Sequence, residues 1–169
     1  RSRSGCIEVS QFLNRNGISN SYLSGKFFED SIIKDFISFL NIIENGHYFD
    51  LGLYRLLSKS KKNTELNMTS IVRHCKAYLN DENFEPAYEE FMSNEVLNFI
   101  RSNTSIDNLN DIVDKFFHFH QTIYKSDLDR GKYNQLISIV EKYLTVYQPI
   151  LKLSLCSYMN SLFDLNETF

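Results

Sequence analysis

The sequence has no tryptophan and few of the residues that terminate helices or form tight turns. Its 169 residues include only 6 glycines and 2 prolines. Because the many short strands of a β-sandwich or barrel are joined by turns rich in such residues, their scarcity disfavours an all-β fold. The chain also has no apolar run near the ~20 residues of a membrane-spanning helix, so we expect neither a membrane segment nor a signal peptide.

Cysteine is scarce as well, and its pattern indicates no chemistry. The three thiols belong to Cys6, Cys75 and Cys156. They form no Cys-x-x-Cys motif, so the sequence predicts neither a zinc site nor a redox pair. An odd number of mostly buried thiols is typical of a reducing compartment, and we expect an intracellular protein, cytoplasmic or nuclear. Sequons at Asn67, Asn103 and Asn166 leave one alternative open, a secreted cytokine-like helical bundle.

The charge is balanced and gives no general attraction toward polyanions. The chain carries 18 basic and 21 acidic residues, which is a formal net charge of −3. We therefore expect no binding to nucleic acid or to an anionic membrane. The local basic run Lys59-Ser60-Lys61-Lys62 is typical of a solvated loop.

Apolar residues recur at helical spacing. From Phe27 to Ile43 they follow one another mostly at intervals of three and four, which predicts a long helix with a wide apolar face. Asn45-Gly46 is a helix stop, and a second helix is predicted over residues 48–59. A long helix, a short turn and a shorter helix together form an αα-hairpin.

Two further hairpins follow the same pattern. The second joins helices predicted over residues 69–79 and 84–100, and the third joins helices predicted over 109–126 and 133–147. No segment alternates with the period of a strand. The predicted fold class is therefore all-α with about eight helices, either stacked as a solenoid or packed as a compact bundle.

The two ends of the chain complete the expected organisation. Pro149 is expected to break or kink the helix that precedes it, and residues 150–163 to form a last helix that closes the core. Residues 1–5 are interpreted as a linker or tag remnant at the start of a fragment of a longer protein. Residues 6–169 then form a single helical domain.

Each predicted hairpin opens its second helix in a similar way. An aromatic residue stands first, and a small or aliphatic residue follows three positions later. The pairs are Phe49 and Gly52, Phe84 and Ala87, and Tyr133 and Leu136. Just after a tight turn, the aromatic side chain is expected to wedge between the two helices. The position three residues on lies where the helices come closest, which favours a small side chain.

This pattern resembles a known repeat family. In the segment "NFEPAYEEF", Asn83, Phe84, Ala87 and Phe91 occupy the positions that mark the second helix of a tetratricopeptide-type repeat. The resemblance covers about 35 residues loosely, a length near one such unit. The Trp, Leu and Gly of the family's first helix have no counterparts here. The resemblance implies a scaffold that presents a groove or helix face to a partner protein.

The residues that most invite a catalytic or metal-binding interpretation have unsuitable spacing. His118 and His120 are two positions apart on a predicted helix, so their side chains point about 200° apart and cannot share one ion. His74 and Cys75 are adjacent and point about 100° apart, so they form no thiolate–imidazole pair by themselves. We therefore predict no catalytic residue, no metal-binding residue, no cofactor and no enzymatic activity.

The predicted function is binding to partner proteins, as a scaffold or adaptor domain of a larger intracellular protein. Aromatic residues and an acidic edge supply the candidate contacts. These contacts are Asp81, Glu82, Glu85, Glu89, Phe28 and Tyr54. The alternative is a homodimerisation domain of a nuclear or chromosomal protein, with the apolar face of residues 27–43 as its interface.

Overall fold

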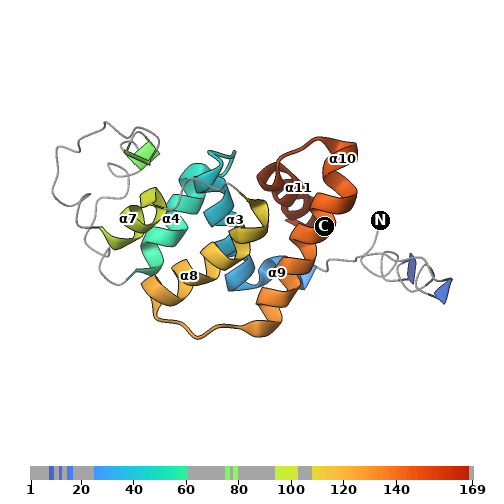
Figure 1. Cartoon of the computed structure of the whole chain (residues 1–169), viewed down its shortest axis with the longest axis horizontal. Helices are drawn as coiled ribbons and strands as arrows, with labels where there is room; N and C mark the ends of the chain where they lie inside the picture. Colours follow the sequence, from blue (N-terminus) through green and yellow to red (C-terminus); the bar gives the residue numbers. More distant parts are fainter. Residues whose placement is uncertain are drawn as a thin grey trace.

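The computed structural model describes residues 25–60, 75–76, 78–79, 94–102 and 108–167, together with residues 8–9, 12 and 15–16. Throughout these residues the regular structure is helical and no strand occurs, which confirms the predicted all-α class. The helices pack into a compact bundle (Figure 1).

The first apolar segment forms two helices where the sequence predicts one. Helix α2 spans Gly25–Glu29 and helix α3 spans Ser31–Ile43. Asp30 interrupts them because its backbone is extended, with φ −64° and ψ 133°, and its side chain caps α3. The carboxylate accepts hydrogen bonds from the amides of Ile32, at 2.9 Å, and Ile33, at 3.4 Å. An N-terminal capping bond of this kind stabilises a helix by about 1 kcal/mol, which favours the break.

The turn after α3 lies where the Asn-Gly pair predicts it. Asn45 adopts a left-handed conformation with φ 53°, and helix α4 then spans Phe49–Lys59. A Cβ atom at Gly46 would lie 2.5 Å from Oδ1 of Asn41 and 2.6 Å from Sγ of Cys156. A larger residue here would have to displace both side chains, so glycine suits the position.

Helices α3 and α4 make their closest approach at Gly52, as the hairpin pattern predicts. A Cβ atom on Gly52 would lie only 2.9 Å from the carbonyl oxygen of Ser38. Phe49 and Leu56, which flank Gly52 on the same helix, are buried. The small residue three positions after the aromatic residue therefore lets the two backbones meet.

The next described helices are α7, Glu95–Ser102, and α8, Ile112–Tyr124, which follows the short 3₁₀ turn η2, Leu109–Asp111. Lys125, with φ 53°, ends α8, and Asp129 caps helix α9, Arg130–Lys142, through the amide of Lys132 at 3.0 Å. The connection is therefore residues 125–129, slightly earlier than the Asp127–Lys132 turn that the sequence suggests.

The hairpin of α8 and α9 also contains its predicted aromatic wedge. The ring of Tyr133 lies 5.4 Å from that of Phe117, and the Tyr133 hydroxyl donates to Asp114 at 2.6 Å. Leu136 and Val140 are buried along the same seam.

Pro149 was predicted to break or kink the helix, and the break does not occur. The chain stays helical through a π-helical turn, η3 (Tyr143–Tyr147), and helix α10 (Gln148–Leu151). Pro149 lies in the first turn of α10, where a missing N–H costs little. The helix ends instead at Lys152, which has φ 52°. The last helix, α11, begins only at Leu155 and runs to Glu167, so residues 150–153 are not part of it.

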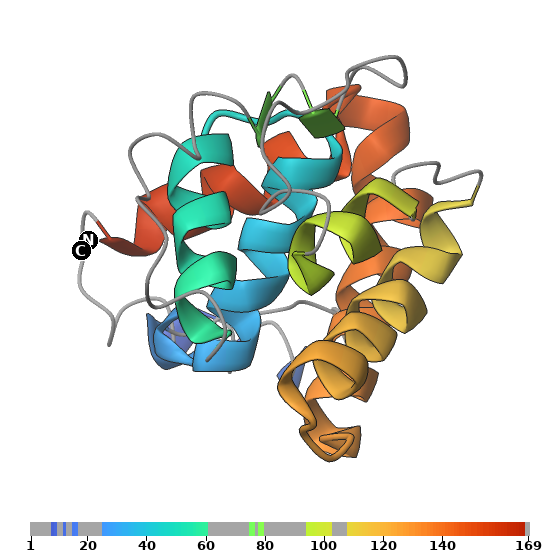
Figure 2. The same ribbon diagram turned by 90° about the vertical axis from the view of Figure 1, so that its left-hand side faces the viewer.

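Helix α3 is the centre of the bundle, with α4, α8 and α11 around it (Figure 2). Nine of its thirteen residues are buried. On the side of α8, Phe36 lies 5.2 Å from Phe116 and Phe39 lies 5.5 Å from Phe119, measured between ring centroids.

The apolar face of residues 27–43 is largely covered within the chain, which corrects one prediction. Phe28 is only 1% exposed, so it is not available as a partner contact in this fold. Most of the apolar side chains on which a homodimer interface was predicted are buried within the chain, and Ile32 and Ile43 are partly buried. The segment that resembles a tetratricopeptide unit, residues 83–91, lies outside the described residues, and that resemblance stays a prediction.

Candidate partner-binding surface

A buried carboxylate holds the centre of the bundle in place. Asp35, on α3, is 0% exposed and meets basic side chains from two other helices. Arg55 Nε lies 2.6 Å from Asp35 Oδ1, and Lys59 Nζ pairs with Oδ2. His120 Nε2, from α8, lies 2.9 Å from the same Oδ2. We call these four residues the Asp35 cluster.

The Asp35 cluster keeps its carboxylate ionised. Burial by itself would raise the pKa of Asp35, but hydrogen bonds from His120 and Lys59 and the positive charges of Lys59 and Arg55 lower it below its usual value. A charge buried in this way is tolerated because it is paired and hydrogen-bonded. The cluster therefore ties α3, α4 and α8 to one another.

His120 has a structural environment. Its Nδ1 lies 2.9 Å from the Ser126 hydroxyl, so both ring nitrogens have partners. Its ring packs edge-on against Tyr124, at 4.9 Å. His118 is exposed and lies beside Phe99, with 5.4 Å between rings, so the two histidines diverge as predicted. Across the part of the chain that the structure describes, no three potential metal ligands come together.

Sequence reasoning missed the link between His120 and Asp35. The signal was an acidic residue inside an apolar helix face, between Ile33 and Phe36. Such a residue needs a basic partner, but its partners lie 20, 24 and 85 residues away along the chain. Local spacing does not identify them.

The other reactive side chains near the core are protonated at neutral pH. Burial raises the pKa of the Cys75 thiol and of the Cys156 thiol to about 12. Burial, together with the charge of Asp35, raises the pKa of Tyr124, whose hydroxyl donates to the Leu56 carbonyl at 2.7 Å. Cys75 is a core residue, as predicted, and its neighbour His74 lies outside the described residues.

A second polar pair attaches α11 to α3. The side-chain amides of Asn41 and Asn160 exchange two hydrogen bonds, both 2.8 Å long, and both residues are buried. Asn41 also accepts a bond from the Tyr48 amide, at 3.0 Å. The start of α4 and the body of α11 are thus fixed on the same residue of α3.

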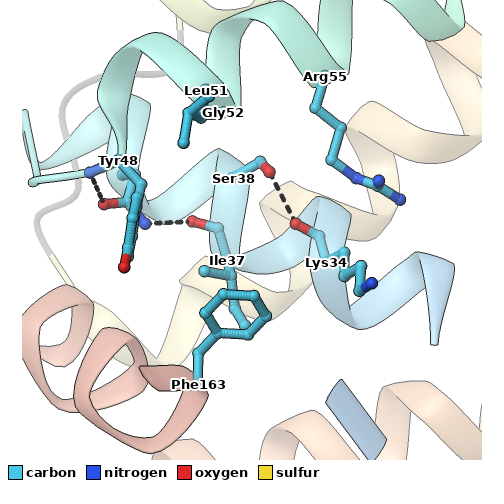
Figure 3. A pocket seen from close by; sticks show the side chains of 9 residues that line it. Lys34, Ile37, Ser38, Tyr48, Leu51, Gly52, Arg55 and Phe163 are labelled. Carbon is cyan, nitrogen blue, oxygen red and sulfur yellow. Dashed lines mark hydrogen bonds between the residues drawn. The ribbon is translucent and has the colours of Figure 1, made fainter. Parts of the chain in front are cut away.

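A surface pocket of about 160 Å³ lies where these three helices meet. Figure 3 shows it between Leu51 and Gly52 on α4, Ile37 on α3 and the ring of Phe163 on α11. We call it the α3–α4–α11 pocket. Its wall is mainly carbon, and Lys34 and Arg55 lie toward one end. The Asp35 cluster anchors Arg55, and the Asn41–Asn160 pair anchors α11, so both sides of the pocket are held by specific contacts.

Two exposed side chains extend the pocket surface along α4. Leu51 is 67% exposed and Tyr54 is 54% exposed, and they are three residues apart on one side of the helix. Tyr54 was predicted as a partner contact, and its exposure is compatible with that role. The predicted acidic contacts Asp81, Glu82, Glu85 and Glu89 lie outside the described residues.

A separate group of exposed apolar residues surrounds α10. Ile150 is 75% exposed, and Val146, Leu151 and Leu153 are also exposed. We call this group the α10 corner. The sequence predicts that residues 150–153 close the core, and this is wrong for their side chains. Their regular apolar spacing gives no sign that Lys152 ends the helix and turns them outward.

Comparisons with known proteins give no relative for this chain: no family model, no curated protein and no solved structure matches it. Within the described residues, the structure contains no helix of the length and hydropathy needed to cross a lipid bilayer. The candidate site must therefore be interpreted from its own geometry.

Proposed function

We propose that this protein is a non-catalytic helical domain that binds a partner protein through the α3–α4–α11 pocket and the adjoining face of α4. The observation that carries the proposal is a mainly apolar pocket that exposed Leu51 lines, with Tyr54 exposed three residues further along the same helix. Binding energy at protein interfaces is concentrated in a few apolar or aromatic residues that fill such pockets.

The size of the pocket supports a protein partner over a small molecule. Sites for cofactors and drug-sized ligands usually measure about 300–1,000 Å³, whereas this pocket measures about 160 Å³. One large apolar side chain of a partner fits this space. The polar side chains around the pocket are already paired: Asn41 with Asn160, and Arg55 with Asp35. They are therefore suited to maintaining the shape of the pocket.

The proposal is tested by capture with matched variants. Leu51→Asp with Tyr54→Ala removes the exposed contacts of α4, and Ile150→Asp with Val146→Ala is the control on the α10 corner. We expect a protein that the wild type and the control retain and that the α4 variant loses. The captured protein is then purified and its direct binding measured by calorimetry. Equal binding by all three chains would contradict the proposal.

Self-association is a second candidate function, and the α10 corner favours it. Four exposed apolar side chains within eight residues are more than scattered surface hydrophobics require. Light scattering coupled to size exclusion, at two concentrations, tests it. A dimer that Ile150→Asp converts to a monomer would support this function, and a wild-type monomer at both concentrations would exclude it.

A further inference from the structure

We propose that the α3–α4–α11 pocket accepts a partner segment in which a large apolar side chain is followed or preceded closely by a carboxylate. This inference rests on the proposed function and adds the chemistry of the partner. The apolar side chain enters the pocket, and the carboxylate lies at the end formed by Lys34 and Arg55.

At the Lys34 end of the pocket, the basic side chains outnumber the carboxylates that pair with them. Asp35 supplies one negative charge, and both Arg55 and Lys59 already face it. Lys34 adds a further positive charge at the pocket, and no carboxylate of the described residues pairs with its side chain. This local excess stands within a chain whose net charge is −3. A partner carboxylate would therefore find an unsatisfied basic group beside an apolar pocket.

Two carboxylates lie near the opposite end of the pocket, outside its lining. The Tyr48 hydroxyl, at that end in Figure 3, donates to Asp164 Oδ1 at 2.6 Å. Asp50 lies in the first turn of α4, which begins beside Tyr48. A carboxylate placed there would be repelled. The carboxylate of a partner segment is therefore expected at the Lys34 end of the pocket and not at the Tyr48 end.

Arg55 contributes positive charge without being free to move. Its Nη2 donates to the Ser31 carbonyl at 3.2 Å and to the Ser31 hydroxyl at 3.1 Å, while its Nε binds Asp35. Lys34 is the side chain able to rotate toward an incoming carboxylate. Discrimination between acidic and basic segments should thus depend mainly on Lys34.

The test uses the full 169-residue chain, labelled with ¹⁵N, and three short amphipathic helical peptides. The first carries one leucine with glutamates one turn away, the second replaces these glutamates by lysines, and the third replaces the leucine by alanine. Amide shifts at Leu51 and Gly52 report the pocket, and the amide of Ile150 reports non-specific binding elsewhere.

We expect the glutamate peptide to bind about tenfold more tightly than the lysine peptide at low salt, with the ratio shrinking as salt is added. Lys34→Glu should invert this preference, whereas the matched control Lys152→Glu should leave it unchanged. Leu51→Ala should weaken both peptides, by about tenfold, through lost apolar burial. Thermal melts of the variants verify that each remains folded.

Two results would overturn the inference while leaving the proposed function standing. They are equal binding of the glutamate and lysine peptides, and an unchanged preference in Lys34→Glu, provided that Leu51→Ala still weakens both peptides. Equal binding of the alanine peptide would show that no apolar anchor is used, and both proposals would then fail. Binding to phosphatidylserine vesicles that requires Lys34, with no peptide binding, would also overturn the inference.

Discussion

Helix α3 and the α10 corner place polar and apolar groups in opposite ways. Helix α3 buries a charged Asp35 and an amide, Asn41, in the middle of an apolar core. The α10 corner exposes four large apolar side chains. Every buried polar side-chain atom among the described residues has a hydrogen-bond partner. The buried polar groups of α3 are therefore accounted for by contacts within the fold. The four exposed side chains of the α10 corner have no corresponding explanation among the described helices around them.

The two regions also differ in the regularity of their backbone. Helix α3 is a regular helix with a capped start. The chain before and after α10 contains a π-helical turn at Tyr143–Tyr147 and a left-handed residue, Lys152. Such turns are rare and are often found at functional sites. Regular helix geometry accompanies the buried centre, and the irregular turns lie beside the exposed side chains of the α10 corner.

The largest expected loss of stability comes from the aromatic contact between α3 and α8. Phe116→Ala removes a fully buried ring that contacts Phe36 and Phe39. We expect unfolding to become easier by about 3–5 kcal/mol, because a cavity replaces the ring. Urea denaturation followed by circular dichroism measures the change. A loss below about 1 kcal/mol would mean that α8 does not pack on α3 as described.

Removing the buried carboxylate should cost nearly as much. Asp35→Ala leaves Arg55, Lys59 and His120 without their common partner, and breaking a buried pair costs about 3–5 kcal/mol. We expect the lower end of that range, because Arg55 and Lys59 are partly exposed and water can solvate them. Asp127→Ala, in the exposed loop after α8, is the control and should have little effect.

The same carboxylate predicts how stability depends on pH. The pKa of Asp35 is lower in the folded chain than in the unfolded chain, so its contribution is fully present above the unfolded value of about 4. The contribution is lost as the pH falls through the lower, folded value. Asp35→Asn should therefore be less stable than the wild type at pH 7, with a gap that narrows below pH about 4. A gap that is constant with pH would contradict this.

The amide pair should show a smaller effect. Asn160→Ala leaves part of the buried Asn41 side chain without a partner, which costs about 1–3 kcal/mol. Because α11 supplies Phe163 to the pocket, the same change should also weaken peptide binding there. Denaturation and the amide shift titration measure the two effects. Asn134→Ala, exposed on α9, serves as the control.

The α10 corner should give the smallest effect on folding. Ile150→Ser replaces an exposed side chain, so we expect a change within about 0.5 kcal/mol. Its influence should be seen instead in light scattering, if the corner mediates self-association. A decrease in the free energy of unfolding of more than about 2 kcal/mol would mean that Ile150 is buried. The contrast drawn between α3 and the α10 corner would then be wrong.

Much of the fold could be predicted from local patterns. The apolar spacing of residues 27–43, the Asn45-Gly46 turn and the small residue at Gly52 each depend on neighbours within a few turns of helix. The turn and the close approach at Gly52 are confirmed, and the apolar segment is helical as predicted apart from its interruption at Asp30. The break at Asp30 and the continued helix at Pro149 were missed because a cap and a π-turn each compete with the simple helical period.

The candidate site could hardly be predicted at all. Tyr54 was proposed from aromatic density, but Phe28 was proposed on the same ground and is buried. The pocket requires Phe163 to meet Ile37 and Leu51, which lie more than a hundred residues earlier. The residue spacing within α3, α4 or α11 does not indicate that these side chains will come into contact. The pocket depends on which helix faces stay exposed after the core has packed.

The Asp35 cluster also bears on whether a fragment of this protein could fold by itself. Its four residues come from three helices, and the histidine is 85 residues away from the carboxylate. A fragment that ends after α4 would leave Asp35 and the buried face of α3 open to water. Units of a linear repeat array can be added or deleted one at a time, because each contacts only its neighbours. Helices α3, α4 and α8 share one buried charge, so we expect them to fold as one unit.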